Sequence, residues 1–371
     1  MRWRSGRVSN RVLIVLGLLA LLCTLGVERF KVERKARYFS AKMEASELAQ
    51  RAQGVIRENR LARGLPIDPV NDPNNTGLIG PQYTLITTDR AALGMKLTAT
   101  NPNLAAVVVQ LLKKAKTGRG GVVGVALTGA SPGLNIAVLA AIETLGLQSI
   151  VITSVGASSW GATDPTYTWL DMESELHRKG VFEHVSVAAS LGGGADLGNG
   201  LSPRGRGLIR EAVERNGQRL IEGSSLEENI LQRMAIYDSL RADRHMGVFI
   251  NVGGGLASLG SSQNARLIPP GLTRRLGTRA FPRKGVTILM AEQGVPIIHL
   301  LEIDRIAERF DLPLEPVPLP EIGEGKIFSE SVYSVPITIA FLVLYSIIMF
   351  CTIRFDMKHY LIRPEGKEIS P

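Results

Sequence analysis

Cysteine and aromatic residues are scarce in this chain. Only 2 of its 371 residues are cysteine and 5% are aromatic, whereas 45% are hydrophobic. Two cysteines cannot form the disulfide framework of a small secreted domain. A wholly disordered chain is excluded as well, because so much apolar side chain has to be buried. The length suits one large domain or two modest ones.

The middle of the chain lacks an excess of charge. The formal net charge is +9, of which residues 1–42 carry +8 and residues 354–371 carry +1, so residues 43–353 have a net charge of zero. A neutral body offers no basic surface to a phosphate backbone. Nucleic acid is therefore not an expected partner.

Two long uncharged runs lie in the basic ends. They are residues 12–27, which are rich in leucine, and residues 335–353. A helix needs about 20 apolar residues to cross a bilayer, within a range of about 17–25. The second run fits this range, and the first can be extended if its flanking basic side chains reach the headgroups. We therefore expect two transmembrane helices, at 12–27 and 335–353.

The first run could instead belong to a cleaved signal peptide, because basic residues precede it. The sequence after it, Leu25-Gly26-Val27-Glu28-Arg29, lacks the small residues of a cleavage site, which favours an uncleaved anchor. Four basic residues follow the second run, whereas only Lys326 lies in the twenty residues before it. This asymmetry predicts a two-pass protein with a cytoplasmic N-terminus (1–11), a cytoplasmic tail (354–371) and an extracytoplasmic body.

Three parts are expected between the two membrane helices. Apolar residues three to five apart among many charges predict that residues 28–60 continue the first helix. This could be a stalk or a partner-binding helix, but a solvated juxtamembrane helix that packs on the domain is favoured; a loop follows it, so that this part covers 28–79. Residues 80–311 are expected to form the extracytoplasmic domain. Four prolines in residues 312–334 predict an extended linker that returns to the membrane.

Short, continuous apolar runs alternate with helical patterns in the expected domain. Runs of this kind are typical of parallel strands that are covered on both faces. We therefore predict an α/β fold with a mainly parallel sheet and helices on both faces, flanked by the two single transmembrane helices. The expected strands are 122–127, 149–155, 185–190, 219–222, 247–252, 286–290 and 295–299. The expected helices include 132–145, 166–178, 203–216, 225–241 and 301–310.

Glycine and small polar residues gather where four of these strands end. The carboxyl ends of parallel strands meet at one edge of a sheet, where helix N-termini present free amides. A pocket for a carboxylate or a phosphate is expected there, although the glycines alone could serve tight turns and helix packing. The candidate ligand-binding residues are Ser131, Asn135, Ser158, Ser159, Gly193, Gly194, Asn251, Gly253, Gly254, Gly255 and Ser258. Among the glycines, Gly254 is expected to need a positive φ or to allow close approach of the ligand.

Signs of catalysis are weaker than signs of binding. The five histidines are scattered without the spacing of metal ligands, so neither a metal nor another cofactor is expected. Asp171 and Glu173 are two residues apart on an expected helix and cannot share a face, which favours surface ion pairs or helix caps. A nucleophile at Ser131 or Ser158 would need a base that the sequence does not identify. The catalytic residues are unknown, and the balance favours a protein that is not an enzyme.

Several segments of the chain resemble the poly-γ-glutamate system protein family. These are bacterial membrane proteins whose genes accompany the subunits that make poly-γ-glutamate, and the likeness covers about residues 10–355. The segments are NNTGLIGP (74–81), TATNPN (98–103), SPGLNIA (131–137), SVGASSWGA (154–162), TWLDME (168–173) and NVGGGLASLG (251–260). The family supplies no catalytic residues that could be assigned here.

The resemblance implies an accessory component of a bacterial poly-γ-glutamate (capsule or exopolymer) synthesis and export system in the inner membrane. Its outer domain would contact the anionic polymer or other membrane subunits of the synthesis complex. Two alternatives stay open. One is a membrane-anchored hydrolase or transferase that trims or attaches the polymer, and the other is an extracytoplasmic sensor that binds a carboxylate ligand.

Overall fold

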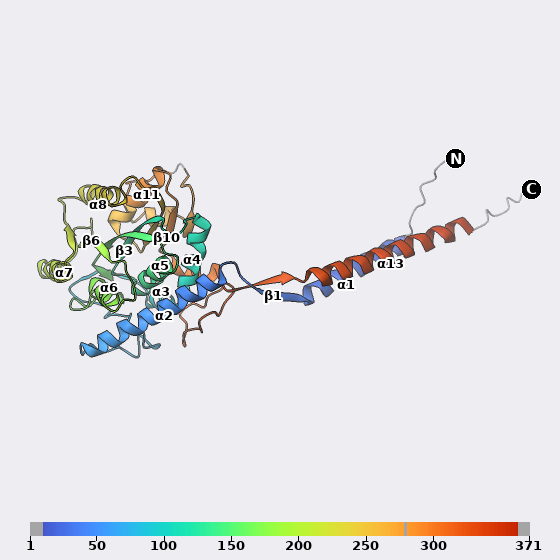
Figure 1. Ribbon diagram of the computed structural model, residues 1–371, viewed down its shortest axis with the longest axis horizontal. Helices are drawn as coiled ribbons and strands as arrows, with labels where there is room; N and C mark the ends of the chain where they lie inside the picture. The colour runs from blue at the N-terminus through green and yellow to red at the C-terminus, as the bar shows by residue number, and fades with distance from the viewer. Residues whose placement is uncertain (1–9, 278–279, 363–371) are drawn as a thin grey trace, which may run out of the picture. The chain divides into compact units, whose positions relative to one another are not determined.

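The computed structural model describes residues 10–277 and 280–362 (Figure 1). The chain forms two compact units. The terminal unit comprises the residues up to Lys35 and those from Ser329 onward, and the central unit is Ala36–Phe328. The predictions for residues 1–9 and 363–371 lie outside the described residues.

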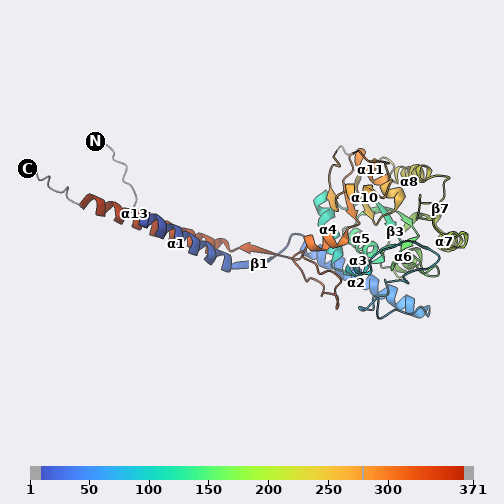
Figure 2. The same cartoon turned by 180° about the vertical axis from the view of Figure 1, so that it is seen from behind.

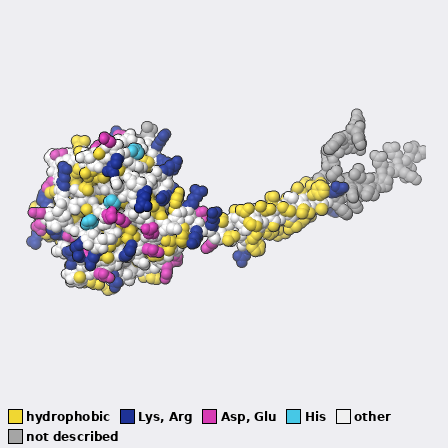
Figure 3. All heavy atoms as spheres, viewed as in Figure 1, with side chains coloured by type: hydrophobic (Ala, Val, Ile, Leu, Met, Phe, Trp, Pro, Cys, Tyr) yellow, Lys and Arg dark blue, Asp and Glu magenta, His cyan; other side chains and the backbone are white. Residues whose placement is uncertain are grey.

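The terminal unit contains two helices that are long and apolar enough to cross a membrane, as predicted. They are α1 (Asn10–Arg29) and α13 (Val335–Ile362), and the apolar part of α13 is Val335–Arg354. Hydrophobic side chains cover the visible surface of this helix pair (Figure 3). The two helices contact one another, and a Cβ added at Gly26 of α1 would lie 2.7 Å from the Phe341 ring of α13. Both predicted apolar helices are thus present and packed together.

A two-stranded antiparallel ribbon belongs to the same unit. It consists of β1 (Lys31–Lys35) and β11 (Ser329–Tyr333), with Val32 opposite Val332 and Arg34 opposite Glu330. The prediction that residues 28–60 continue the first helix is therefore wrong. Pairing with a strand almost 300 residues away in sequence overrides the helical spacing, and the left-handed conformation of Tyr38, with a φ of 62°, separates the ribbon from the next helix.

The central unit is built on a seven-stranded sheet that is mainly parallel, as predicted. All neighbouring strands are parallel except β9, which is antiparallel to β10. The order across the sheet is β7 (Arg219–Ile221), β6 (Ser186–Ser190), β4 (Gln148–Ser154), β3 (Val122–Thr128), β8 (Met246–Val252), β10 (Ile297–Leu300) and β9 (Gly271–Thr273).

All five helix ranges named above for this domain are helical in the structure, and two of these helices begin at serine caps. Ser202 Oγ accepts a hydrogen bond from Gly205 N, and Ser225 Oγ accepts one from Glu228 N. The helices are α2 (Phe39–Ala62), α3 (Leu93–Ala99), α4 (Leu104–Ala115), α5 (Pro132–Thr144), α6 (Trp169–Arg178), α7 (Pro203–Arg215), α8 (Leu226–Arg241), α9 (Leu256–Leu259), α10 (Asn264–Leu267), α11 (Val286–Glu292) and α12 (Ile303–Arg309).

One predicted strand is a helix. Residues 286–290 belong to α11, which contacts α8 and α9. Its run of Val, Thr, Ile, Leu and Met is apolar throughout, and a short run of this kind fits a buried helix as well as a buried strand. Position in the tertiary structure, and not the local pattern, decides between the two.

Alternate residues of β3 belong to two different hydrophobic clusters. Val123, Val125 and Leu127 pack with residues of α2, α4 and α5, whereas Val122 and Ala126 pack with residues of α8 and α11. Figures 1 and 2 show these two groups of helices around the strands. Every residue of β3 is buried, which explains why this strand appears in the sequence as a continuous apolar run.

Helix α2 and the proline-rich segment are both part of the central unit. Helix α2 packs on the domain, as predicted: Ala45, Ala49, Ala52 and Ile56 are at most 1% exposed, whereas Arg51 on its other face is exposed. The proline-rich segment is not a free linker: for example, Asn74 Nδ2 donates to the carbonyl oxygen of Pro316 at 2.6 Å. The hydrogen bond to Pro316 is a tertiary contact, which the local sequence does not reveal.

The order of the strands defines a switch point between β3 and β8. From β3 the chain proceeds through β4 and β6 to β7 on one side, and from β8 it proceeds to β10 on the other. Open α/β sheets bind ligands outside the carboxyl ends of the strands at such a point. A separate parallel pair consists of β2 (Thr87–Asp89) and β5 (Ala157–Ser158), and β5 follows β4 in the chain.

Candidate functional site

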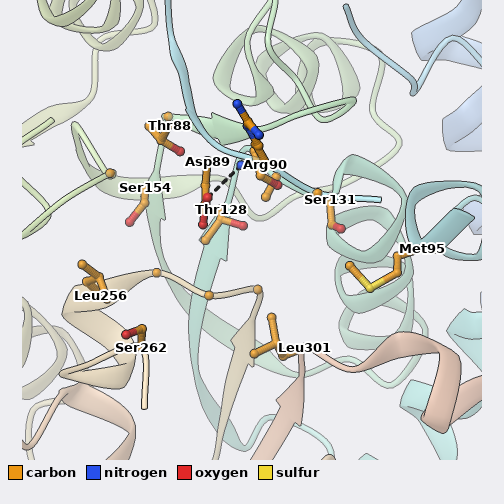
Figure 4. A pocket seen from close by; sticks show the side chains of 18 of the residues that line it. Thr88, Asp89, Arg90, Met95, Thr128, Ser131, Ser154, Leu256, Ser262 and Leu301 are labelled. Carbon is orange, nitrogen blue, oxygen red and sulfur yellow. Dashed lines mark hydrogen bonds between the residues drawn. The ribbon is translucent and has the colours of Figure 1, made fainter. Parts of the chain in front are cut away.

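A cavity of about 460 Å³ lies at the switch point (Figure 4). Its wall takes Thr128 from the end of β3 and Ser154 from the end of β4. The turns after β6, β8 and β10 and the segment from Thr88 to Lys96 complete it. In Figure 4 the labelled side chains of Thr128, Ser131 and Ser154 surround the same space. The carboxyl edge of the sheet therefore forms one site to which five strands contribute.

The structure brings seven of the eleven candidate residues to this cavity. They are Ser131, Ser158, Gly193, Gly194, Gly253, Gly254 and Gly255. Their convergence follows from the parallel order of the strands, which places the turns after β3, β6 and β8 at one edge. Whether these residues bind a ligand stays a prediction.

The special backbone conformation lies at Gly253 and not at Gly254. Gly253 has a φ of +83°, and a Cβ added there would lie 2.6 Å from Thr128 Oγ1. A Cβ added at Gly254 would meet only Leu301 Cδ1, at 3.8 Å. The expectation that Gly254 needs a positive φ is therefore wrong. A glycine run does not show which of its members the turn requires.

The other four candidates are buried beside the cavity and do not line it. Asn135 Nδ2 donates to the carbonyl oxygen of Thr128 at 2.8 Å. Asn251 Nδ2 donates to the Gly253 carbonyl oxygen at 2.9 Å. These contacts hold the turns after β3 and β8. Ser159 and Ser258 likewise bond within the protein, to the Asp89 carbonyl oxygen and to Thr287 Oγ1.

Lys96 of α3 is a buried cation in the cavity wall. The residue is only 6% exposed, and its Nζ donates to the Ala130 carbonyl oxygen and contacts Ser158 Oγ at 2.9 Å. Among the described residues no carboxylate pairs with this ammonium group, and burial lowers the pKa of Lys96 to about 8. The site thus holds a desolvated positive charge that no carboxylate of the described residues neutralises.

The N-terminus of α5 opens beside Lys96. Ser131 is its N-cap residue, and its side chain makes no capping hydrogen bond, so its hydroxyl is directed to the cavity (Figure 4). Pro132 has no N–H, and Asn135 N donates to the Ser131 carbonyl oxygen at 3.0 Å, which leaves the N–H groups of Gly133 and Leu134 at this positive end of the helix. Two positions of this turn have room only for glycine. A Cβ added at Gly129 would lie 2.3 Å from the Val155 carbonyl oxygen, and one added at Gly133 would lie 2.2 Å from the Ala99 carbonyl oxygen.

The sequence carries a stronger signal for Ser131 than its place after a strand. Residues 129–133 read Gly-Ala-Ser-Pro-Gly, which fits the Gly-x-Ser-x-Gly pattern between a strand and a helix. The backbone does not adopt the strained conformation of a nucleophile elbow, since Ser131 has a φ of −140°. The histidine base that accompanies that motif is also missing from the residues that line the described cavity.

His299, the histidine that occupies a strand end, is part of the scaffold. It is 1% exposed, its Nδ1 accepts from Asn251 Nδ2 at 2.9 Å, and burial lowers its pKa to about 4. The ring is therefore neutral at physiological pH. It supports the Asn251 side chain that in turn holds the Gly253 turn.

The rim of the cavity carries one charge of each sign. Asp89 and Arg90 are both exposed, and Asp89 Oδ1 accepts from the Arg90 backbone N at 2.7 Å. With Lys96 they are the charged residues of the described lining, which therefore has a net charge of +1. The positive charge lies in the wall, whereas the opposite charges at the rim are in contact with water.

A buried ion pair supports the wall at the ends of β4 and β6. Arg233 and Asp196 have side chains that are 1% and 0% exposed, with Nη2 and Oδ2 3.1 Å apart. Arg233 Nη2 also donates to Ser154 Oγ at 3.0 Å and to Ser190 Oγ at 2.7 Å. Since Ser154 lines the cavity, this network fixes the position of one of its hydroxyl groups.

The two acidic residues of α6 have structural roles. Asp171 forms a capping box with Thr168 and an ion pair with Arg215, as expected for a cap or an ion pair. Glu173 is not at the surface: it is 2% exposed and accepts hydrogen bonds from the backbone N and the hydroxyl of Ser186. Burial raises the pKa of Glu173 to about 7. Neither residue lines the cavity.

Sequence reasoning missed the segment that closes the cavity, residues 88–96. A signal for Lys96 exists, because it is the one charged residue in the otherwise apolar and small stretch 91–99. Among the residues that the structure describes, no group of three or more His, Cys, Asp or Glu could hold a metal ion. No family model, curated protein or solved structure matches the chain.

Proposed function

We propose that the protein binds a carboxylate-bearing ligand in this cavity and that the ligand is a poly-γ-glutamate chain or its end. The observation that carries the proposal is the burial of Lys96 in the cavity wall without a carboxylate partner among the described residues. A buried charge costs free energy unless it is paired. A ligand carboxylate would supply the missing partner.

The surroundings of Lys96 support an anionic ligand. The first turn of α5 contributes Ser131 and Leu134 to the same wall, and its available N–H groups are those of Gly133 and Leu134. Helix N-termini bind anions through such amides and the helix dipole. Hydroxyl groups of Ser131 and Thr128 add donors that can orient a carboxylate. Poly-γ-glutamate offers one carboxylate in each residue, so this chemistry agrees with the family resemblance.

The wider role that we propose is that of an accessory component of a bacterial poly-γ-glutamate synthesis and export system. Helices α1 and α13 would cross the inner membrane and pack against other membrane subunits, with both termini in the cytoplasm and the α/β domain outside. The two apolar helices support the membrane location, and the charges around α13 support the orientation. The two hydrophobic clusters support a domain whose sheet is covered by helices on both faces.

Binding of defined oligo-γ-glutamate to the full-length protein in nanodiscs tests the proposal. Wild type should bind, and Lys96→Met should weaken binding at least 10-fold, because a charge-assisted contact of 1.5–3 kcal/mol is lost, which is roughly 10- to 100-fold in affinity. Lys114→Met is the matched control, since Lys114 is exposed on α4. Absence of binding by wild type, or equal affinities of wild type and Lys96→Met, would refute the proposal.

A test in cells addresses the membership of the system. Deletion of the gene in the natural host should abolish the polymer or alter its length or attachment, and a plasmid copy should restore the wild-type polymer. The Lys96→Met copy should fail to restore it, whereas the Lys114→Met copy should succeed. Unchanged polymer in the deletion strain would rule out a role in this system.

A further inference from the structure

We propose that Ser158 and Lys96 form a nucleophile–base pair, and that the cavity carries out acyl transfer on γ-glutamyl amide or ester bonds. The choice of a γ-glutamyl substrate rests on the proposed function. The assignment of the two residues does not, because it depends on their contact, on the elements that hold them and on the protonation state of Lys96. The sequence does not identify a base for a serine nucleophile of this site, and in this pair Lys96 is that base.

The first argument is the contact between the two side chains. Lys96 Nζ lies 2.9 Å from Ser158 Oγ, which is within the range for direct proton transfer. Both residues line the cavity, and Ser158 is half-buried, so a substrate in the cavity can reach its oxygen. An activated serine requires a base at this distance.

The second argument is that both partners are held in place. Lys96 Nζ also donates to the Ala130 carbonyl oxygen, which restrains the amine on its long side chain. Ser158 belongs to β5 and lies opposite Asp89 of β2. The neighbouring Ser159 N donates to the Asp89 carbonyl oxygen at 2.9 Å. A base and a nucleophile on fixed backbone elements meet the requirement for preorganisation.

The third argument is the protonation state of the amine. Burial lowers the pKa of Lys96 to about 8, so roughly a tenth of the molecules carry the neutral amine at pH 7. The charged groups near α3 are Asp89 and Arg90 at the cavity rim and Glu315, which packs against Gly94. Helix α12, which also packs against α3, carries Asp304, Arg305, Glu308 and Arg309. None of these groups forms an ion pair with Lys96 among the described contacts, and desolvation is the cause of its lowered pKa.

The reaction can be written with the groups of this cavity. Neutral Lys96 takes the proton of Ser158 Oγ while this oxygen forms a bond to the carbonyl carbon of the substrate. The tetrahedral intermediate then collapses, the carbon–nitrogen or carbon–oxygen bond breaks, and the leaving group takes the proton from Lys96. Ser158 is now acylated through an ester bond. Water or an acceptor amine attacks this ester, gives one proton to Lys96, and releases Ser158 as the proton returns to its oxygen.

The acceptor decides the outcome of this reaction. With water the polymer is shortened, and with an amine the acyl group is attached to a new molecule. The N–H groups of Gly133 and Leu134 follow Pro132 in the first turn of α5, which lines the same wall, and they can stabilise the negative charge that develops on the carbonyl oxygen. The same elements that would hold a carboxylate thus serve an acyl-transfer transition state.

Labelling of the full-length protein in nanodiscs with a fluorophosphonate probe tests the pair, with the modified peptide identified by mass spectrometry. We expect the label on Ser158, and we expect Ser158→Ala and Lys96→Arg to reduce its rate by roughly 100-fold or more, as for loss of a nucleophile or a general base. Arginine keeps the positive charge but cannot act as the base. The matched controls are Ser40→Ala and Lys114→Arg, whose side chains are exposed on α2 and α4.

The pH profile separates a base from a structural lysine. The labelling rate of wild type should rise about tenfold per pH unit up to pH 8 and then level off, as the neutral amine becomes the main species. Turnover of γ-glutamyl p-nitroanilide should follow the same curve. A label on Ser131, no label on Ser158, or a rate that Lys96→Arg leaves unchanged would overturn the assignment.

The two proposals fail in different ways. Labelling of Ser158 without binding of oligo-γ-glutamate would keep the nucleophile–base pair and refute the proposed ligand. Binding of oligo-γ-glutamate that Lys96→Arg preserves, without labelling of Ser158, would keep the carboxylate site and refute the catalytic pair.

Discussion

Lys96 Nζ lies 2.9 Å from Ser158 Oγ although 62 residues separate the two in sequence. Lys96 belongs to α3, which packs against α5 and α12, and Ser158 belongs to β5, which pairs with β2. Neither α3 nor β5 belongs to the main sheet, and Lys96 also donates to Ala130, in the turn that follows β3. The contact therefore places an amine and a hydroxyl group side by side in the cavity wall.

Replacement of Lys96 by methionine should stabilise the protein at pH 7. The drop in the pKa of this lysine from 10.5 to about 8 corresponds to a cost of about 3 kcal/mol for the buried charge, and part of the gain is offset by the lost hydrogen bonds. We expect the free energy of unfolding to rise by about 1–2 kcal/mol.

Unfolding by urea at several pH values, followed by tryptophan fluorescence, measures this gain. Between pH 8 and 10.5 the unfolded chain holds more protons at this position than the folded chain, so wild type gains stability as the pH rises. The advantage of Lys96→Met should therefore shrink over this range. A variant less stable than wild type at pH 7 would show that Lys96 is a structural residue.

Removal of Asp196 should strongly destabilise the central unit. Asp196→Ala leaves Arg233 as an unpaired charge that is 1% exposed, which costs about 3–5 kcal/mol. Asp238→Ala is the matched control, because the side chains of the Asp238–Arg241 pair are 43% and 30% exposed, and such a pair should contribute at most about 1 kcal/mol. Similar losses of unfolding free energy in the two variants would contradict the structural role of the buried pair.

Glu173 should make stability depend on pH below neutrality. Burial raises its pKa from 4.5 to about 7, so the folded state holds more protons at this position between these two values. Stability is therefore lost as the pH rises from 4.5 to 7, by about 3 kcal/mol. Glu173→Gln should remove this loss and exceed wild type in unfolding free energy at pH 8. Parallel pH profiles of the two proteins between pH 4.5 and 8 would refute the assignment.

The two adjacent glycines after β8 should respond differently to alanine. Gly253→Ala places a Cβ at a positive φ and 2.6 Å from Thr128 Oγ1, and it should cost about 1–3 kcal/mol of unfolding free energy. Gly254→Ala meets only a contact of 3.8 Å and should change stability by less than about 0.5 kcal/mol. Equal effects of the two substitutions would contradict the described turn.

The sequence predicts the parallel sheet and its turns well because the signals are local. Continuous apolar runs such as Val122–Thr128 indicate buried strands, and the glycine turns after them lie at one edge by topology. The strand β1 escaped prediction because its partner β11 lies at the other end of the chain. Apolar composition alone could not separate helix α11 from a strand.

Only part of the candidate site can be predicted from the sequence, because only part of it has a local signal. Glycine and serine mark the turns that follow strands, and seven such residues line the cavity. The opposite wall comes from residues 88–96, which only tertiary contacts bring to the sheet edge. Asn135 and Asn251 look like ligand-binding residues in the sequence, but they bond to the carbonyl oxygens of Thr128 and Gly253.

The affinity of the full-length protein for oligo-γ-glutamate, measured in nanodiscs between pH 6 and 9.5, tests the central claim most directly. If the protonated amine of Lys96 holds a carboxylate, the affinity should be constant below pH 7. It should then fall by up to tenfold per unit above pH 8, as Lys96 loses its charge. Lys96→Arg should bind without this decline, because arginine keeps its charge throughout the range. An affinity that does not change with pH in wild type, or one that Lys96→Met does not lower at pH 7, would contradict the account.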